Sequence, residues 1–131
     1  MNTSHALIIE DNIKNVRILG ILLDRFGVGH TDILNPVDIL EMLPVMDMDS
    51  INIVFLDLEM PDVNGYDVLD MLKSDVRFSE VPIVAYTAHS SEASNARNAG
   101  FHSFIAKPLS PDRFPDQLAR ILRGEHVWDR V

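Results

Sequence analysis

Short apolar runs alternate with segments of helical spacing along the whole chain. An apolar run at residues 6–9 ends abruptly in carboxylates, and residues 13–26 then carry apolar side chains at helical intervals. The later predicted strands lie at 28–34, 51–56, 81–86 and 101–106, and the later predicted helices at 36–43, 66–73, 90–99 and about 115–123. The pattern therefore indicates five strand–helix pairs.

Most of these strands are almost continuously apolar, which is typical of a parallel sheet covered by helices on both faces. Crossovers between parallel strands are right-handed, so the candidates reduce to an α/β, doubly wound fold of Rossmann or flavodoxin type. The 131 residues fit one domain. One local conflict concerns Pro115, which falls inside the last helical pattern. We expect a short turn at 111–114 and a regular helix that begins near Pro115.

The composition narrows the classes of function. Eleven basic and twenty acidic residues give a net charge of −9. An acidic chain without a basic patch repels phosphate backbones, so we expect no nucleic-acid partner. The absence of cysteine excludes disulfides and thiolate metal sites. No apolar run approaches the about 18 residues that a membrane helix needs, so we expect a cytoplasmic protein without a membrane partner.

The residues that follow the predicted strands carry the candidate chemistry. The first strand ends in Glu10 and Asp11, the third in Asp57, the fourth in Thr87 and the fifth in Lys107. Doubly wound sheets bind ligands beyond the carboxyl ends of their strands. Three acids, a hydroxyl and an ammonium group are thus predicted to meet in one crevice. Taken singly, each is more simply a cap, a loop residue or a solvated side chain; the combination is far more specific.

Three neighbouring carboxylates repel one another unless one is protonated or a cation lies among them. Oxygen ligands without His or Cys suit Mg²⁺. Such a cation beside Asp57 could neutralise an incoming phosphoryl group, while Lys107 and Thr87 donate to its oxygens. Asp57 would be the nucleophile, because an aspartate can accept phosphate as an acyl phosphate. The residues therefore predict a Mg²⁺-dependent phosphoacceptor site.

Four segments resemble the receiver domain of two-component response regulators, the CheY-like family, over about residues 5–123. They read LIIEDN at 7–12, FLDLEMPDVNG at 55–65, AYTA at 85–88 and FIAKP at 104–108. The resemblance implies a flavodoxin/CheY-like (βα)5 fold with strand order 2-1-3-4-5. It also implies a receiver domain at 1–124 and no output domain. Residues 125–131 would form a short C-terminal tail, in which we expect Trp128 to pack against the far edge of the sheet.

The resemblance also implies a role for each site residue. Asp57 corresponds to the aspartate that a sensor histidine kinase or a phosphotransfer protein phosphorylates. The Lys107–Pro108 peptide bond is expected to be cis, as is common in the family. The other implied roles are Mg²⁺ binding by Glu10, Asp11, Asp57 and the backbone carbonyl of Glu59; phosphoryl binding by Thr87, the backbone of Ala88 and Lys107; switching by Thr87 and Phe104; and tuning of dephosphorylation by Glu59 and His89.

The leading interpretation is a stand-alone receiver that signals through a phosphorylation-linked change in protein–protein contacts. The contact face would comprise the fourth helix, the fifth strand and the fifth helix. Such a protein would catalyse only its own phosphoryl transfer and autodephosphorylation, and is not expected to be an enzyme otherwise. It would act as a monomer or weak dimer on a downstream protein that the sequence does not identify.

Two alternatives remain open from the residues. A strand-one glutamate with Asp57-Leu58-Glu59 is similar to the Toprim fold of Mg²⁺-dependent phosphodiester enzymes, although that motif reads Asp-x-Asp. That interpretation leaves Thr87 and Lys107-Pro108 unexplained, and the net charge of −9 opposes DNA. A haloacid-dehalogenase-type phosphatase fails similarly, because the sequence lacks its Asp-x-Asp motif. The second alternative is a pseudo-receiver that binds partners without phosphorylation, against which the intact aspartate and lysine argue.

Overall fold

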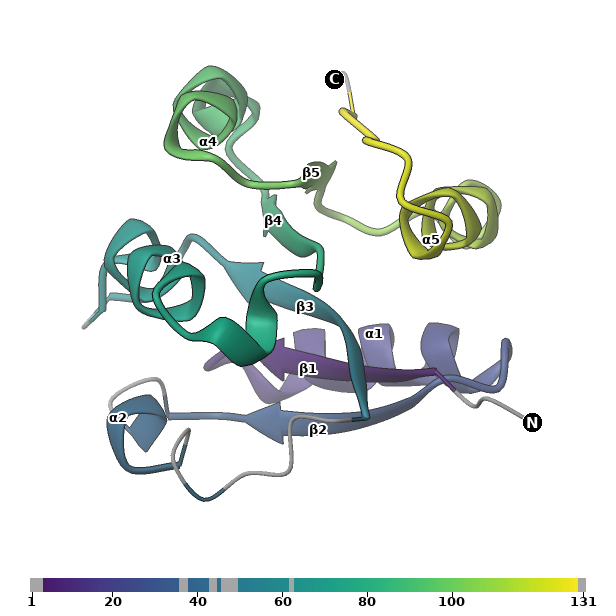
Figure 1. Cartoon of the computed structure of the whole chain (residues 1–131). Helices are drawn as coiled ribbons and strands as arrows, with labels where there is room; N and C mark the ends of the chain where they lie inside the picture. The colour runs from purple at the N-terminus through teal and green to yellow at the C-terminus, as the bar shows by residue number, and fades with distance from the viewer. Residues whose placement is uncertain (1–3, 36–37, 43–44, 46–49, 62, 130–131) are drawn as a thin grey trace.

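A computed structural model describes residues 4–35, 38–42, 45, 50–61 and 63–129. They fold into a five-stranded parallel sheet with helices on both faces (Figure 1). The strand order is β2-β1-β3-β4-β5, so the predicted doubly wound fold is confirmed. The strands are β1 (His5–Ile9), β2 (Gly29–Ile33), β3 (Ile51–Asp57), β4 (Ile83–Thr87) and β5 (Ser103–Ala106).

Two hydrophobic cores lie on opposite faces of the sheet. Helices α1 (Ile13–Asp24) and α5 (Phe114–Leu122) cover one face, where Leu19 and Leu118 meet the sheet. The other face carries α2 (Ile39–Met42), α3 (Gly65–Lys73) and α4 (Ala93–Ala99) (Figure 1). The central strands β1 and β3 are buried from both sides, which explains why their sequences are apolar without alternation.

Several boundaries differ from the sequence prediction for local physical reasons. The predicted helix at 90–99 is divided into a 3₁₀ turn, η3 (Ser90–Glu92), and the seven-residue α4, whose only buried residue is Ala96. A second 3₁₀ turn, η2 (Val76–Phe78), follows α3. Helix α5 begins at Phe114 with proline in its first turn, as expected for a residue that has no N–H to donate. Residues 36, 37 and 43 of the predicted helix at 36–43 lie outside the described residues.

Asparagine caps begin the helices that follow the acidic strand ends. The Asn12 side chain accepts from the backbone N–H groups of Lys14 and Asn15, at 2.9 and 3.3 Å, and begins α1. Asn64 accepts from the Tyr66 N–H at 2.8 Å and begins α3 in the same way. Each cap satisfies backbone donors that would otherwise lack a partner. These caps fix where the loops after β1 and β3 end.

The register of the sheet brings distant strand ends to one edge. Asp57 at the end of β3 pairs with Tyr86 of β4, and Thr87 at the end of β4 pairs with Ala106 of β5. Strand β1 ends level with β3, because Ile9 pairs with Leu56. The last residues of β3 and β4 and the residues that follow β1 and β5 therefore lie at the carboxyl edge of the sheet, where the predicted crevice lies.

The residues after α5 turn back toward the sheet and run beside β5, between α4 and α5 (Figure 1). Trp128 forms a parallel bridge with Phe104 of β5, so the predicted packing of Trp128 against the far edge of the sheet is confirmed. Among the described residues, no helix is long and apolar enough to cross a membrane.

Candidate functional site

Three carboxylates converge at the carboxyl edge of the sheet and form what we call the acid cluster: Glu10, Asp11 and Asp57. One oxygen of each lies within 4.8 Å of the other two. The Glu10 and Asp57 residues are 0% and 2% exposed, whereas Asp11 is exposed to solvent. The cluster thus has a buried floor and one solvent-facing member, as a site open to incoming ligands requires.

Lys107 connects the two buried carboxylates. Its Nζ lies 3.1 Å from Glu10 Oε1 and 3.1 Å from Asp57 Oδ1, and its side chain is only 12% exposed. The same ammonium group lies 4.5 Å from the centroid of the Tyr86 ring, which is a favourable cation–π position. The Lys107–Pro108 peptide bond is cis. One cation therefore faces two buried anions.

The electrostatics of the cluster reflect an excess of negative charge. Burial raises the pKa of the Glu10 carboxyl, and the hydrogen bond and charge of Asp57 raise it further, against the opposing effect of Lys107. Partial burial, together with the charge of Glu10, also raises the pKa of Asp11. The Tyr86 hydroxyl donates to Glu10 Oε1 at 3.2 Å. Lys107 and the Tyr86 hydroxyl therefore compensate the negative charge of the acid cluster only in part.

A hard divalent cation fits this donor set. The side-chain ligands of the acid cluster are all carboxylate oxygens, and no His or Cys belongs to the described cluster. Mg²⁺ commonly binds one or two carboxylates and keeps several waters, and the solvent-facing Asp11 leaves room for those waters. The Glu59 N–H donates to Asp57 Oδ1 at 2.9 Å, which holds the backbone after β3 close to the phosphoacceptor candidate.

Glu59 contributes a contact that the sequence did not reveal. Its Oε1 accepts hydrogen bonds from both the Thr87 hydroxyl and the Ala88 N–H. His89 Nε2 lies 3.9 Å from the same oxygen. Burial by itself would raise the pKa of Glu59, but the hydrogen bonds from Thr87 and Ala88 outweigh it and the pKa lies below its ordinary value. A carboxylate of this chain therefore occupies two of the three donors that were expected to hold phosphoryl oxygens; the third is Lys107.

The switch candidate Phe104 lies away from the acid cluster, fully buried in the middle of β5. The Trp128 ring packs on it with 6.0 Å between ring centroids. Tyr86 and Trp128 were not predicted to belong to this network. The position of Tyr86 directly before Thr87 could have indicated that Tyr86 lies near the site. No local pattern shows that the tail reaches Phe104.

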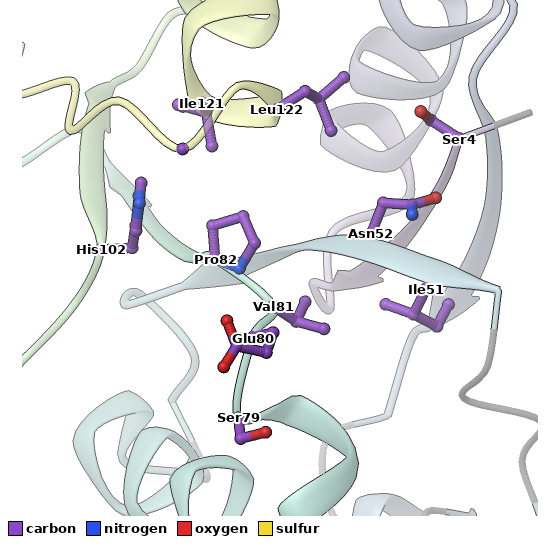
Figure 2. A pocket seen from close by; sticks show the side chains of 11 residues that line it. Ser4, Ile51, Asn52, Ser79, Glu80, Val81, Pro82, His102, Ile121 and Leu122 are labelled. Carbon is purple, nitrogen blue, oxygen red and sulfur yellow. The ribbon is translucent and has the colours of Figure 1, made fainter. Parts of the chain in front are cut away.

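One pocket lies at the opposite end of the sheet, among residues that precede the strands. Ser4 before β1, Pro82 before β4 and His102 before β5 line it, together with Ile121 of α5 (Figure 2). It contains no member of the acid cluster. The rule that doubly wound sheets bind ligands at the carboxyl ends of their strands favours the other edge.

The comparisons with known proteins agree with this geometry. A family model described as the response regulator receiver domain matches residues 6–119. The chain belongs to this family. The Toprim-like and phosphatase alternatives are therefore replaced by a receiver domain of two-component signalling, and receiver domains are generally signalling modules rather than enzymes.

Curated relatives of this receiver domain include whole proteins of similar length. It is 29% identical over 119 residues to the chemotaxis protein CheY1 of Helicobacter pylori, covering 88% of this chain and 94% of CheY1. It is 26% identical over 122 residues to the polar-differentiation response regulator DivK of Brucella ovis, covering 92% and 97%. A third relative, the chemotaxis protein CheV1 of H. pylori, is 31% identical over 111 residues, covering 82% of this chain but only 35% of CheV1.

Solved structures show the same fold. The chemotaxis response regulator CheY4 of Vibrio cholerae superposes with a TM-score of 0.78 at 16% identity, covering 91% of this chain and 98% of CheY4. A response regulator receiver protein from Burkholderia phymatum reaches 0.79 at 23% identity, covering 92% and 95%. The chain spans 54% of the response regulator DrrB of Thermotoga maritima, with a TM-score of 0.75 at 21% identity and 94% of this chain covered.

Proposed function

We propose that this receiver domain accepts a phosphoryl group on Asp57 from a histidine kinase or phosphotransfer protein, in a reaction that needs Mg²⁺. The observation that carries the proposal is the pair of 3.1 Å contacts from Lys107 Nζ to Asp57 and Glu10, at the buried floor of the acid cluster. A buried nucleophilic carboxylate, an ammonium group and further carboxylates for a cation are the parts that phosphoryl transfer to aspartate requires.

The covalent step forms one bond and breaks one. An oxygen of Asp57 attacks the phosphorus, and the bond from phosphorus to the imidazole nitrogen of the donor histidine breaks. The electron pair stays on that nitrogen. The donor leaves directly as a neutral imidazole when its other ring nitrogen carries a proton, and otherwise takes one proton from solvent. Bound Mg²⁺ would supply charge compensation to the phosphoryl oxygens, with Glu10, Asp11, Asp57 and the Glu59 carbonyl as its ligands.

The chain's own donors complete the site. Lys107 keeps its position beside Asp57 and pairs with the negative charge of the new acyl phosphate. The Thr87 hydroxyl and the Ala88 N–H bind phosphoryl oxygens once the Glu59 carboxylate has left them. Movement of Thr87 toward the phosphoryl group then changes the packing of Phe104, which links the site to the face made by α4, β5 and α5.

The finer parts of the function complete the proposal. The protein acts as a stand-alone response regulator in the cytoplasm, as a monomer or weak dimer. Its phosphorylation alters contacts with a downstream protein, and Glu59 and His89 set how long the phosphoryl group lasts. Full-length relatives such as CheY1 and DivK, which this chain covers almost entirely, support this organisation.

Mass spectrometry of the intact protein tests the proposal. Acetyl phosphate with Mg²⁺ should add one phosphoryl mass to the wild type, and EDTA should prevent the addition. Asp57→Asn should abolish labelling, whereas Asp67→Asn and Asp70→Asn, which change exposed acids of α3, should leave it intact. Unchanged labelling of Asp57→Asn would place the acceptor elsewhere. No labelling of any folded variant, wild type included, would favour the phosphorylation-independent alternative, to which the occupation of Thr87 and Ala88 by Glu59 gives some support.

A further inference from the structure

The tail segment, which we define as Glu125–Asp129, runs along the outer side of β5, where Trp128 forms a single parallel bridge with Phe104. Strand β5 is the last strand in the sheet order, so its outer side would present unpaired backbone groups. The Phe104 N–H donates to the Val127 carbonyl at 2.9 Å, and the Asp129 N–H donates to the Phe104 carbonyl at 2.9 Å. The Ala106 N–H donates to Asp129 Oδ2 at 3.1 Å. The tail segment thus partners the outer backbone groups of β5.

Two successive side chains of the tail segment, those of Val127 and Trp128, pack against opposite faces of the sheet, as neighbouring residues of an extended chain do. Val127 is buried in the core of the α1 and α5 face, and its N–H donates to the buried Ser103 hydroxyl at 3.0 Å. Trp128 packs on the opposite face, against Phe104. The Asp129 side chain accepts a hydrogen bond from the Ala106 N–H and is almost completely buried. The tail segment therefore contacts both cores of the protein.

Two arginines provide the chemistry of this selection. The Arg97 guanidinium of α4 lies 5.1 Å from the Trp128 ring centroid, and the Phe104 ring packs on the same indole with 6.0 Å between centroids. Arg113 Nη1, just before α5, lies 3.1 Å from Asp129 Oδ1. An aromatic ring in contact with a cation and a phenyl ring, followed by a carboxylate paired with an arginine, is a specific pattern of recognition.

We propose that the edge of β5, between α4 and α5, is a docking groove for an extended protein segment with an apolar, an aromatic and an acidic residue in succession. In the structure the tail segment occupies this groove as an internal ligand, and the segment of a downstream protein replaces it by strand addition. The proposal rests on the proposed signalling function only in assigning the segment to a downstream protein. Because Phe104 lies under Trp128, the groove includes the residue proposed to switch.

A titration followed by NMR tests this groove without metal or phosphoryl donor. The protein is the full chain with Trp128→Ala and Asp129→Ala, and the probe is an acetylated peptide of sequence Glu-His-Val-Trp-Asp. The peptide should shift the amide signals of Phe104 and Ala106 in a saturable way. Its dissociation constant for the double variant should be at least about tenfold lower than for the wild type, because the intact tail competes at a high effective concentration.

Matched controls separate recognition from non-specific binding. A peptide with alanine in place of Trp and Asp should bind at least about tenfold more weakly, because it lacks both the ring and the carboxylate. Adding Arg113→Ala to the double variant should weaken binding, whereas adding Arg17→Ala, an exposed cation of α1, should not. If the double variant unfolds, Asp129→Asn alone replaces it, with the same expected order of affinities.

Two results would overturn the proposal. The first is a folded variant whose Phe104 and Ala106 signals do not respond to the peptide, or respond equally to the alanine control. The second is a wild-type dimer in which the tail segment lies on β5 of the other copy, as shown by sedimentation and by intermolecular NOEs from Trp128. Neither result concerns Asp57, so failure of the groove and failure of the phosphoacceptor site are distinguishable.

Discussion

Removing the Glu59 carboxylate should make phosphorylation of Asp57 more favourable. Glu59 holds the Thr87 hydroxyl and the Ala88 N–H in the resting structure, and a phosphoryl oxygen must displace it from both. A hydrogen bond to a charged group contributes about 1.5–3 kcal/mol. The displaced carboxylate regains solvent, because its side chain is already 29% exposed. The phosphoryl oxygens also reuse both donors, so the net cost of displacement is about 1–2 kcal/mol, a factor of about 5–30.

The assay is the extent and rate of labelling by acetyl phosphate at saturating Mg²⁺, measured by intact mass. Glu59→Ala should raise the labelling equilibrium by about 5- to 30-fold. Glu59→Gln should lie between the wild type and Glu59→Ala, because the amide oxygen still accepts but carries no charge. Asp70→Ala, which removes one exposed acid of α3 away from the site, should behave like the wild type.

The contact between Glu59 and the Ala88 N–H can be tested by NMR without any phosphoryl donor. The Ala88 amide proton donates to Glu59 in the resting protein, so its NMR signal should move upfield in Glu59→Ala before any phosphoryl donor is added. An unchanged Ala88 signal would show that Glu59 does not occupy these donors in solution. A shifted signal with unchanged labelling would show that the occupied donors do not oppose phosphorylation.

Three further outcomes follow from the same contacts. Mg²⁺ should shift the amides at the ends of β1 and β3, and Asp57→Asn should weaken Mg²⁺ binding by about tenfold or more; shifts confined to other strands would remove the metal site. Phosphorylation should change the fluorescence of Trp128, the only tryptophan, and Thr87→Ala should abolish that change while labelling persists; an unaltered response would separate Thr87 from the switch. Burial, with the charge of His126, lowers the pKa of His102 below its ordinary value of 6.5. The unfolded chain therefore binds the proton first, stability declines as pH falls below about 6.5, and His102→Gln should reduce this decline in a thermal melt.

Much of this protein follows from local sequence. Apolar runs that end in acids predicted the strands, because a strand buried on both faces cannot alternate with polar residues. The carboxyl ends of parallel strands share one edge, so the sequence alone predicted that Glu10, Asp57 and Lys107 lie close together. The position of Pro115 likewise predicted where α5 begins, since an α-helix accommodates proline only in its first turn.

Other features depended on contacts between segments far apart in the chain. Glu59 and Thr87 are separated by 28 residues, and only the pairing of β3 with β4 places the carboxylate on the hydroxyl. Helix α4 begins later than its sequence pattern suggests, because residues 90–92 form a 3₁₀ turn and only small alanines pack the helix against the core. The tail segment shows no strand pattern of its own. It lies along β5 because that strand offers unpaired backbone groups and because Arg97 of α4 and Arg113, just before α5, contact Trp128 and Asp129. The tertiary fold alone brings those groups together.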